Sequence, residues 1–389
     1  MKRGKEAWEL LRASAAARLD RARTRELLAR LGPEPEWNAI LELARRQGIA
    51  PLLARALENA GGIEEMSAGA REELKEFCKE HLFFTLRMTA ELGRICGRFA
   101  AAGVEAAAVK GPALAQQAFG GGSLRQYADL DIVVRQRDAA RATRILLEDG
   151  YAAEISEEEA GGKNIPGQYC FWRESPAALV ELHTERTLRY FVKGFPVEEL
   201  FARRERVSVD GQSVPALAAE DALVFICVHG SKHFWERLMW IADVAGFVER
   251  QSGLDWGKAL AVARETGTER MVRLGLLLAA DVLAAEIPAE AIAAARADRA
   301  AARLAGELGQ RFRGGEEMEE GALRRARTRA WMCGGGWRGA AFLLRLLFTP
   351  TEEDWSGESG RRAAGWRGVL RRPVRLARKY GGGRSERKK

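Results

Sequence analysis

The 389-residue chain is predicted to have an α+β fold, with a mixed sheet flanked by helices between N-terminal and C-terminal helical segments. Apolar residues recur at helical spacing through the first hundred residues. Short apolar runs bounded by glycine or acidic residues fill the next stretch, and helical periodicity returns after Ala219. The predicted divisions are a helical segment at 1–100, an α/β core at 101–217, a helical domain at 218–335, and an amphipathic, basic tail at 336–389.

The first segment is predicted to form several helices. Trp8 and Leu11 begin one apolar helical stripe, and a Gly-Pro pair at 32–33 ends the run that follows it. A longer helix is expected over about 70–102. His81 lies among leucine and phenylalanine in that helix, and we expect it to be a core residue.

The core segment is predicted to contain short strands. Its last two strands form a hairpin, because Asp210-Gly211 is a turn dipeptide between alternating apolar residues. The expected strands are Val104–Val109, Leu130–Val134, Tyr151–Ile155, Gln168–Arg173 and Leu179–His183, with the hairpin at Val207–Leu217 and a helix at Asp138–Asp149.

Composition and charge exclude several classes of protein. Hydrophobic residues make up 47% and charged residues 30%, which is ordinary for a globular chain. The net charge is +8, but residues 361–389 carry twelve Lys and Arg and one acid, so the remainder is slightly acidic. This distribution argues against a broad nucleic-acid-binding body and limits contact with an anionic surface to the tail. Apolar runs are too short for a transmembrane segment, and five scattered cysteines without CxxC spacing indicate a reducing cytoplasm.

Two aspartates at the head of an apolar strand are the strongest chemical signal. Asp129 and Asp131 are two residues apart, so in an extended chain they point to the same face. Neighbouring carboxylates repel each other unless a cation lies between them, and Mg²⁺ suits such a site. The competing interpretation is an acid pair that faces water.

Residues on both sides of the pair strengthen the first interpretation. Lys110-Gly111 ends one strand and begins a helix, where free backbone N–H groups and a lysine suit a phosphate. Glu181 places a third acid in another apolar strand, where it could help to hold a second metal ion or act as a base. The alternative for Glu181 is an exposed residue paired with Arg173 or Arg186, and Lys110 could simply end a strand.

These motifs together resemble the polymerase-β-like nucleotidyltransferase superfamily, and most closely the bacterial group called uncharacterised nucleotidyltransferase family proteins. Members of that group carry sequence motifs such as LKG…L, R…D-[IL]-D-[IL]-[LV]-V and [ED]-L-H. These are followed by a helix with the pattern LCLHG-x-KH-x-W-x-R-L-x-W-[IL]-x-D. The matching stretches are Val109–Gly111 with Leu114, Arg125 with Asp129–Val134, Glu181–His183, and CVHGSKHFWERLMWIADVA at 227–245. The resemblance covers most of the chain.

The resemblance implies transfer of a nucleoside monophosphate from a nucleoside triphosphate to an acceptor, with release of pyrophosphate. It implies Mg²⁺ or Mn²⁺ held by Asp129, Asp131 and Glu181, with Lys110 and Gly111 on the triphosphate. The acceptor stays open, with a small molecule, a peptide natural product, a protein or a polysaccharide precursor among the candidates. Gly111-Pro112 lacks the serine of the superfamily motif and lies eighteen residues before the first aspartate instead of about ten.

A histidine pair is the second candidate feature. His229 and His233 are four residues apart on one predicted helix, and they either pack against the core or line the nucleotide pocket with Lys232. Asp243 would lie about 21 Å further along a continuous helix, too far to share a metal ion with them unless the helix breaks. Arg125 is a candidate substrate ligand or a structural partner of the two aspartates.

Two other functions remain open from the sequence. An ATP-dependent kinase on the same scaffold differs only in which phosphorus is attacked. The second alternative is a non-catalytic interaction module that binds a nucleotide. Such a module has usually lost one of the three carboxylates.

Overall fold

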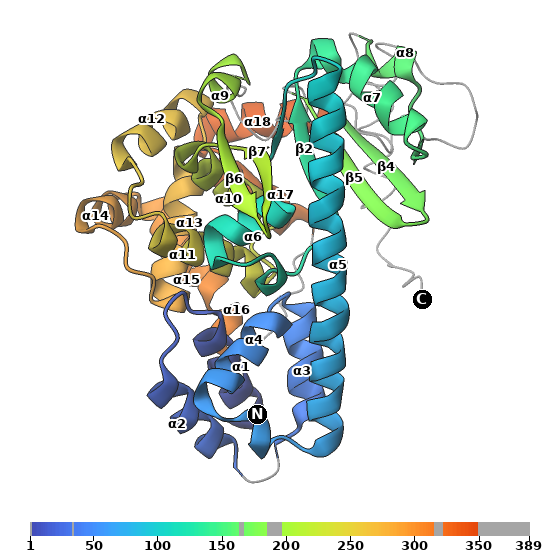
Figure 1. Cartoon of the computed structure of the whole chain (residues 1–389). Coiled ribbons are helices and arrows are strands. Elements are labelled where there is room, and N and C mark those ends of the chain that lie inside the picture. The colour runs from blue at the N-terminus through green and yellow to red at the C-terminus, as the bar shows by residue number, and fades with distance from the viewer. Residues whose placement is uncertain (1, 33–34, 163–166, 185–196, 315–321, 349–389) are drawn as a thin grey trace.

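The computed structural model describes residues 2–32, 35–162, 167–184, 197–314 and 322–348 and confirms the α+β class. Its centre is one mixed sheet in the order β3-β4-β5-β2-β1-β7-β6 (Figure 1). Of the predicted amphipathic, basic tail at 336–389, residues 336–348 form a helix, and 349–389 lie outside the described residues. The strands are β1 (Ala106–Ala108), β2 (Leu130–Val134), β3 (Ala152–Ala153), β4 (Gln168–Glu174), β5 (Ala177–His183), β6 (Glu205–Val209) and β7 (Gln212–Ala216).

The sheet has the antiparallel pair of β2 and β1 at its centre and a hairpin on each side. β2 pairs parallel with β5 and antiparallel with β1, and β1 pairs parallel with β7. Asp210 and Gly211 adopt positive φ angles of 47° and 82° in the turn between β6 and β7, as the predicted hairpin requires. β2 has the predicted bounds, whereas β1 and β3 are shorter than the apolar runs that predicted them.

The first helices pack below the sheet, and one long helix connects them to it (Figure 1). These helices are α1 (Lys2–Ala15), α2 (Arg21–Leu31), α3 (Trp37–Arg46), α4 (Ala50–Ala60) and α5 (Ala68–Ala101), with the 3-10 turn η1 (Ile63–Glu65). The Ser67 side chain caps α5 by accepting a hydrogen bond from the Ala70 N–H. Leu92, Ile95 and Phe99 recur at helical spacing and pack against one face of the sheet, so α5 covers that face.

The opposite face of the sheet meets the C-terminal helices. Helices within the core are α6 (Gly111–Phe119), α7 (Ala139–Glu148), α8 (Glu157–Ala160) and α9 (Val197–Arg203), with the 3-10 turns η2 (Gly122–Leu124) and η3 (Gln136–Asp138). The later helices are α10 (Ala219–Lys232), α11 (Leu238–Arg250), α12 (Trp256–Thr266), α13 (Glu269–Leu283), α14 (Ala289–Ala297), α15 (Arg299–Gly309), α16 (Arg311–Gly314), α17 (Ala322–Met332) and α18 (Gly336–Phe348). Among the helices of the described ranges, none has the length and apolar character needed to cross a bilayer.

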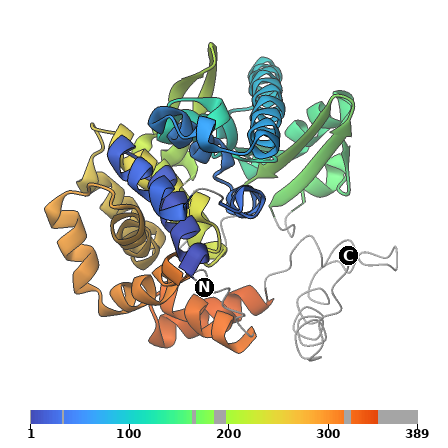
Figure 2. The same cartoon turned by 90° about the horizontal axis from the view of Figure 1, so that it is seen from below.

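The N-terminal and C-terminal helices share one apolar core. Trp8 of α1 lies edge-on to Phe312 of α16, with ring centroids 5.7 Å apart. The same buried cluster includes Leu11, Phe247 of α11 and Leu278 of α13. Figure 2 shows the first helix lying across the C-terminal helices. Two segments that are far apart in the sequence therefore pack as one helical layer, which also meets the sheet through Val133.

Candidate active site

The central parallel strands bring two of the predicted carboxylates together. Every residue of β2 is buried, and Asp131 is only 2% exposed. Asp131 lies directly opposite Glu181 on β5. Side chains at paired positions of neighbouring strands lie on the same face of a sheet. Asp129 lies in the bend that leads into β2.

Glu181 is held by a neighbour on the next strand. The Gln168 side-chain amide on β4 donates a hydrogen bond to Glu181 Oε2 over 3.0 Å. The alternative partner Arg173 instead forms an ion pair with Glu91 on α5, 2.9 Å away. Arg186, the other alternative partner, lies outside the described residues. Glu181 is thus partly buried at the face that carries Asp131.

His183 joins the two carboxylates, a position that the sequence motifs did not predict. It follows Glu181 by two residues on β5, so both side chains lie on one face. The His183 Nε2 atom lies 3.0 Å from Asp131 Oδ1 and 3.5 Å from Glu181 Oε2. The available signal was the Glu-Leu-His spacing, which repeats the two-residue spacing of the aspartates on the neighbouring strand.

Lys110 and Gly111 approach the same carboxylates from β1. The Lys110 Nζ atom lies 2.8 Å from Asp131 Oδ1, so in this structure the lysine is paired with a carboxylate. Gly111 begins α6 with a φ of +58°, a left-handed conformation that favours glycine. A Cβ atom at Gly111 would lie 3.3 Å from the Asp129 carbonyl oxygen. The glycine therefore allows the start of α6 to approach the aspartates closely.

Arg125 pairs with Asp243, a partner that the sequence did not predict. Its guanidinium donates two hydrogen bonds to Asp243 of α11, over 2.8 and 2.9 Å, and both residues are buried. His81 Nε2 donates to the Arg125 backbone carbonyl and is buried, as expected for a core histidine. The Arg125–Asp243 pair fixes the segment before Asp129 to the helical layer.

The two later histidines lie on a broken helix. α10 ends at Lys232 and α11 starts at Leu238, so the break that the sequence left open is present in this stretch. Between them Trp235 adopts a positive φ and is completely buried. Because the chain turns there, Trp240 stacks on His233 with centroids 5.0 Å apart, and His229 lies 4.8 Å from His233.

Burial and neighbouring cations keep both imidazoles neutral. Burial, together with the charges of Lys110 and His233, lowers the pKa of His229 well below its ordinary value. Burial and the charge of Lys232 lower the pKa of His233 to about 3. His229 is therefore a neutral ring near Lys110, and Lys232 ends α10 beside this ring cluster.

The carboxylates differ in charge state because their neighbours differ. Burial alone would raise the pKa of Asp131, but Lys110 and His183 hold it below its usual range. Burial and the charge of Asp131 raise the pKa of Asp129 to about 6, although Lys110 partly opposes this. Burial would lower the pKa of Lys110, but the surrounding carboxylates raise it. Two cations thus compensate a buried anionic site.

The donor set fits a divalent cation. One donor atom from each of Asp131, Glu181 and His183 lies within 4.8 Å of the other two. Asp131 Oδ2 is buried and has no hydrogen-bond partner. A buried carboxylate oxygen without a donor is costly, and a bound cation would satisfy it. Carboxylate oxygens suit Mg²⁺ and Mn²⁺, as the sequence analysis expected.

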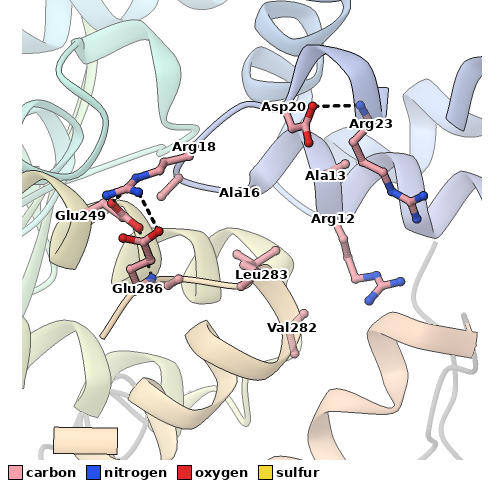
Figure 3. A pocket seen from close by; sticks show the side chains of 13 residues that line it. Arg12, Ala13, Ala16, Arg18, Asp20, Arg23, Glu249, Val282, Leu283 and Glu286 are labelled. Atoms are coloured by element: carbon pink, nitrogen blue, oxygen red, sulfur yellow. Dashed lines mark hydrogen bonds and ion pairs between the residues drawn. The ribbon is translucent and has the colours of Figure 1, made fainter. Parts of the chain in front are cut away.

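One pocket borders the site, and another lies away from it. A groove of about 320 Å³ between α5 and residues 126–128 ends at Ala128, next to Asp129, and Phe77, Phe84 and Tyr127 line it. A second pocket of about 280 Å³ lies between α1 and the α11–α13 region (Figure 3). There Arg18 bridges two glutamates, and none of the candidate site residues lines it.

The fold and the site define a class of α+β protein in which paired carboxylates lie beside a helix that starts at a glycine. Residues 33–284 match the family described as uncharacterised nucleotidyltransferase. This match covers more than half of the chain and includes all the candidate site residues, so the chain belongs to that family. The resemblance stated from the motifs is confirmed.

The chain is also similar to a solved structure, the crystal structure of an antigenic nucleotidyltransferase-like protein from Paracoccidioides brasiliensis. The identity is 13% and the TM-score is 0.32, and the match covers 52% of this chain and 95% of that one. No curated protein matches the sequence.

Proposed function

We propose that this protein is a nucleotidyltransferase that moves a nucleoside monophosphate from a nucleoside triphosphate to an acceptor and depends on a divalent cation. The observation that carries the proposal is the pairing of Asp131 with Glu181 on parallel neighbouring strands, with Lys110 at 2.8 Å from Asp131. Family membership supports the class of reaction.

The residues have separate roles in this proposal. Asp129, Asp131 and Glu181 hold the cation, for which Mg²⁺ or Mn²⁺ is the candidate. When bound, the cation would neutralise phosphate charge and favour loss of a proton from the acceptor hydroxyl. Lys110 and the backbone at the start of α6 bind the phosphates that leave, which requires Lys110 to exchange Asp131 for a phosphate oxygen.

The reaction balances without any further reagent. An acceptor oxygen attacks the α-phosphorus while the bond from that phosphorus to the β-bridging oxygen breaks, and pyrophosphate leaves. The proton of an acceptor hydroxyl passes to Glu181 or to solvent. Positioning and charge neutralisation supply most of the rate enhancement in such reactions.

The test uses nucleoside triphosphates labelled at the α- or the γ-phosphate, with the full chain, Mg²⁺ or Mn²⁺, and pools of metabolites and peptides. Transfer of α-label with release of pyrophosphate is the expected result. Glu181→Gln is expected to reduce turnover by roughly 10²-fold or more while nucleotide affinity survives, because a base or cation ligand acts mainly in the transition state.

A second readout does not require the acceptor. Mg²⁺ with a nucleoside triphosphate is expected to raise the melting temperature, because the pair binds only the folded state. Asp131→Asn should remove this shift, whereas Asp281→Asn, an exposed aspartate on α13, should retain it. Transfer of γ-label would indicate a kinase. Nucleotide binding with no transfer of either label would indicate a binding module, and an unchanged shift in Asp131→Asn would place the cation site elsewhere.

A further inference from the structure

We infer that His183 is a direct ligand of the divalent cation, so that the site selects a first-row transition ion such as Mn²⁺ over Mg²⁺. This inference rests on the cation site of the proposed function but not on the transfer reaction. It adds a nitrogen donor to a site that the motifs describe as carboxylates alone.

The first argument is the direction of the ring. The His183 ring faces both carboxylates with its Nε2 atom, which lies 3.0 Å from Asp131 Oδ1 and 3.5 Å from Glu181 Oε2. The three donor atoms available from these residues lie within 4.8 Å of one another. Asp131 lies opposite Glu181 on the paired strand, and His183 follows Glu181 by two residues, so the backbone of the sheet holds the three side chains together.

The second argument is that the ring has no other polar contact among the residues that the structure describes. His183 is buried, and its Nδ1 atom has no hydrogen-bond partner. His81 provides a contrast, because it donates to a backbone carbonyl and stacks between Phe77 and Phe84. A histidine kept for packing has such contacts, whereas within the described ranges the His183 ring makes its polar contacts with the two carboxylates alone.

The third argument is the unpartnered oxygen beside the ring. Asp131 Oδ2 is buried without a donor, while Oδ1 of the same carboxylate accepts from His183 and from Lys110. The two protein cations together satisfy only one of the two oxygens. A cation bound to Asp131, Glu181 and His183 would engage the carboxylate more fully. Coordination by Nε2 requires that its proton leave to solvent or be carried on Nδ1 instead.

The chemistry of the donors sets the selectivity. Mg²⁺ prefers oxygen ligands and gives up its water reluctantly, whereas imidazole suits first-row transition ions. A site with two carboxylates and one imidazole therefore binds Mn²⁺ more tightly than a site with two carboxylates and an amide does. Mg²⁺ gains little from the nitrogen.

The experiment measures binding of the metal alone to the full chain. Electron paramagnetic resonance of free Mn²⁺ gives its Kd, and competition gives that of Mg²⁺. Pulsed measurements on the Mn²⁺-loaded wild-type protein should detect coupling to a directly bound imidazole nitrogen. His183→Gln should remove that coupling and weaken Mn²⁺ by about tenfold or more, while the Kd of Mg²⁺ changes less than about threefold. His81→Gln is the matched control and should keep both the coupling and the preference for Mn²⁺.

The outcomes separate this inference from the proposed function. If Mn²⁺ binds the wild-type protein without nitrogen coupling, His183 is not a ligand, while the carboxylate site survives. An unchanged ratio of Mn²⁺ to Mg²⁺ affinity in His183→Gln also overturns the inference. Failure of either metal to bind, even with a nucleoside triphosphate present, contradicts the cation site itself and therefore both proposals. Should His183→Gln fail to fold, judged by circular dichroism, the wild-type nitrogen coupling alone decides.

Discussion

The buried ion pair between Arg125 and Asp243 is the contact whose loss should affect the fold most. Asp243→Asn keeps the shape but removes the charge that compensates a guanidinium only 5% exposed. Two charge-assisted hydrogen bonds of 2.8 and 2.9 Å lose their carboxylate. Breaking a buried pair costs about 3–5 kcal/mol.

Nearby anions place the expected cost at the lower end of this range. Burial alone would lower the pKa of Arg125, but Asp243, Asp131 and Asp129 raise it. After the substitution the last two charges still compensate part of the guanidinium charge. The expected loss in the free energy of unfolding is therefore about 3 kcal/mol.

Urea unfolding followed by circular dichroism measures this loss at neutral pH. Glu249→Gln is the control, because it removes one carboxylate from an ion pair with Arg18 (Figure 3). The Arg18 side chain is 67% exposed, so this change should cost less than about 1 kcal/mol. Replacing the buried pair by Arg125→Met with Asp243→Leu should recover much of the stability. A cost below about 1 kcal/mol for Asp243→Asn, equal to that of the control, would refute the reasoning.

Two further predictions concern backbone and charge. Gly111→Ala should lower the free energy of unfolding by about 1–2 kcal/mol because Gly111 has a positive φ. Gly97→Ala, on α5 with open space around it, should raise the free energy of unfolding by about 0.5–1 kcal/mol. Urea unfolding measures both changes, and a change of the same sign in the two variants would contradict the argument. Burial would raise the pKa of Glu91, but two arginines and a tyrosine lower it from 4.5 to about 2. Because the folded value lies below the unfolded one, the stability from Glu91 is present above about pH 4.5 and is lost as the pH falls toward 2. Glu91→Gln should flatten the decline of unfolding free energy in that window, and an unchanged slope would exclude this network as its cause.

The sequence by itself determined the local elements. A short apolar run with acidic residues at its head predicted β2 at its observed bounds, and a turn dipeptide between alternating apolar residues predicted the hairpin of β6 and β7. These signals are local, because side-chain period and turn conformation depend on neighbouring residues. The family motif at 227–245 suggested one helix, and the sequence left open whether it breaks; the structure divides this stretch between α10 and α11. Trp235 packs against Gly230 of α10 and Gly275 of α13. A packing contact with α13 therefore accompanies the break between α10 and α11.

The candidate site, too, was predicted in part from the sequence and in part only from the tertiary structure. Spacing predicted that Asp131 and Glu181 carry the chemistry, because each residue type and its strand can be read from the chain. Only the tertiary structure decided that β2 and β5 are parallel neighbours in a register that sets these two residues opposite each other and adds His183 to them. It also decided that Arg125 pairs with Asp243, a residue on a helix 118 positions away. Strand register and long-range ion pairs depend on which surfaces meet after folding, and no local pattern records that.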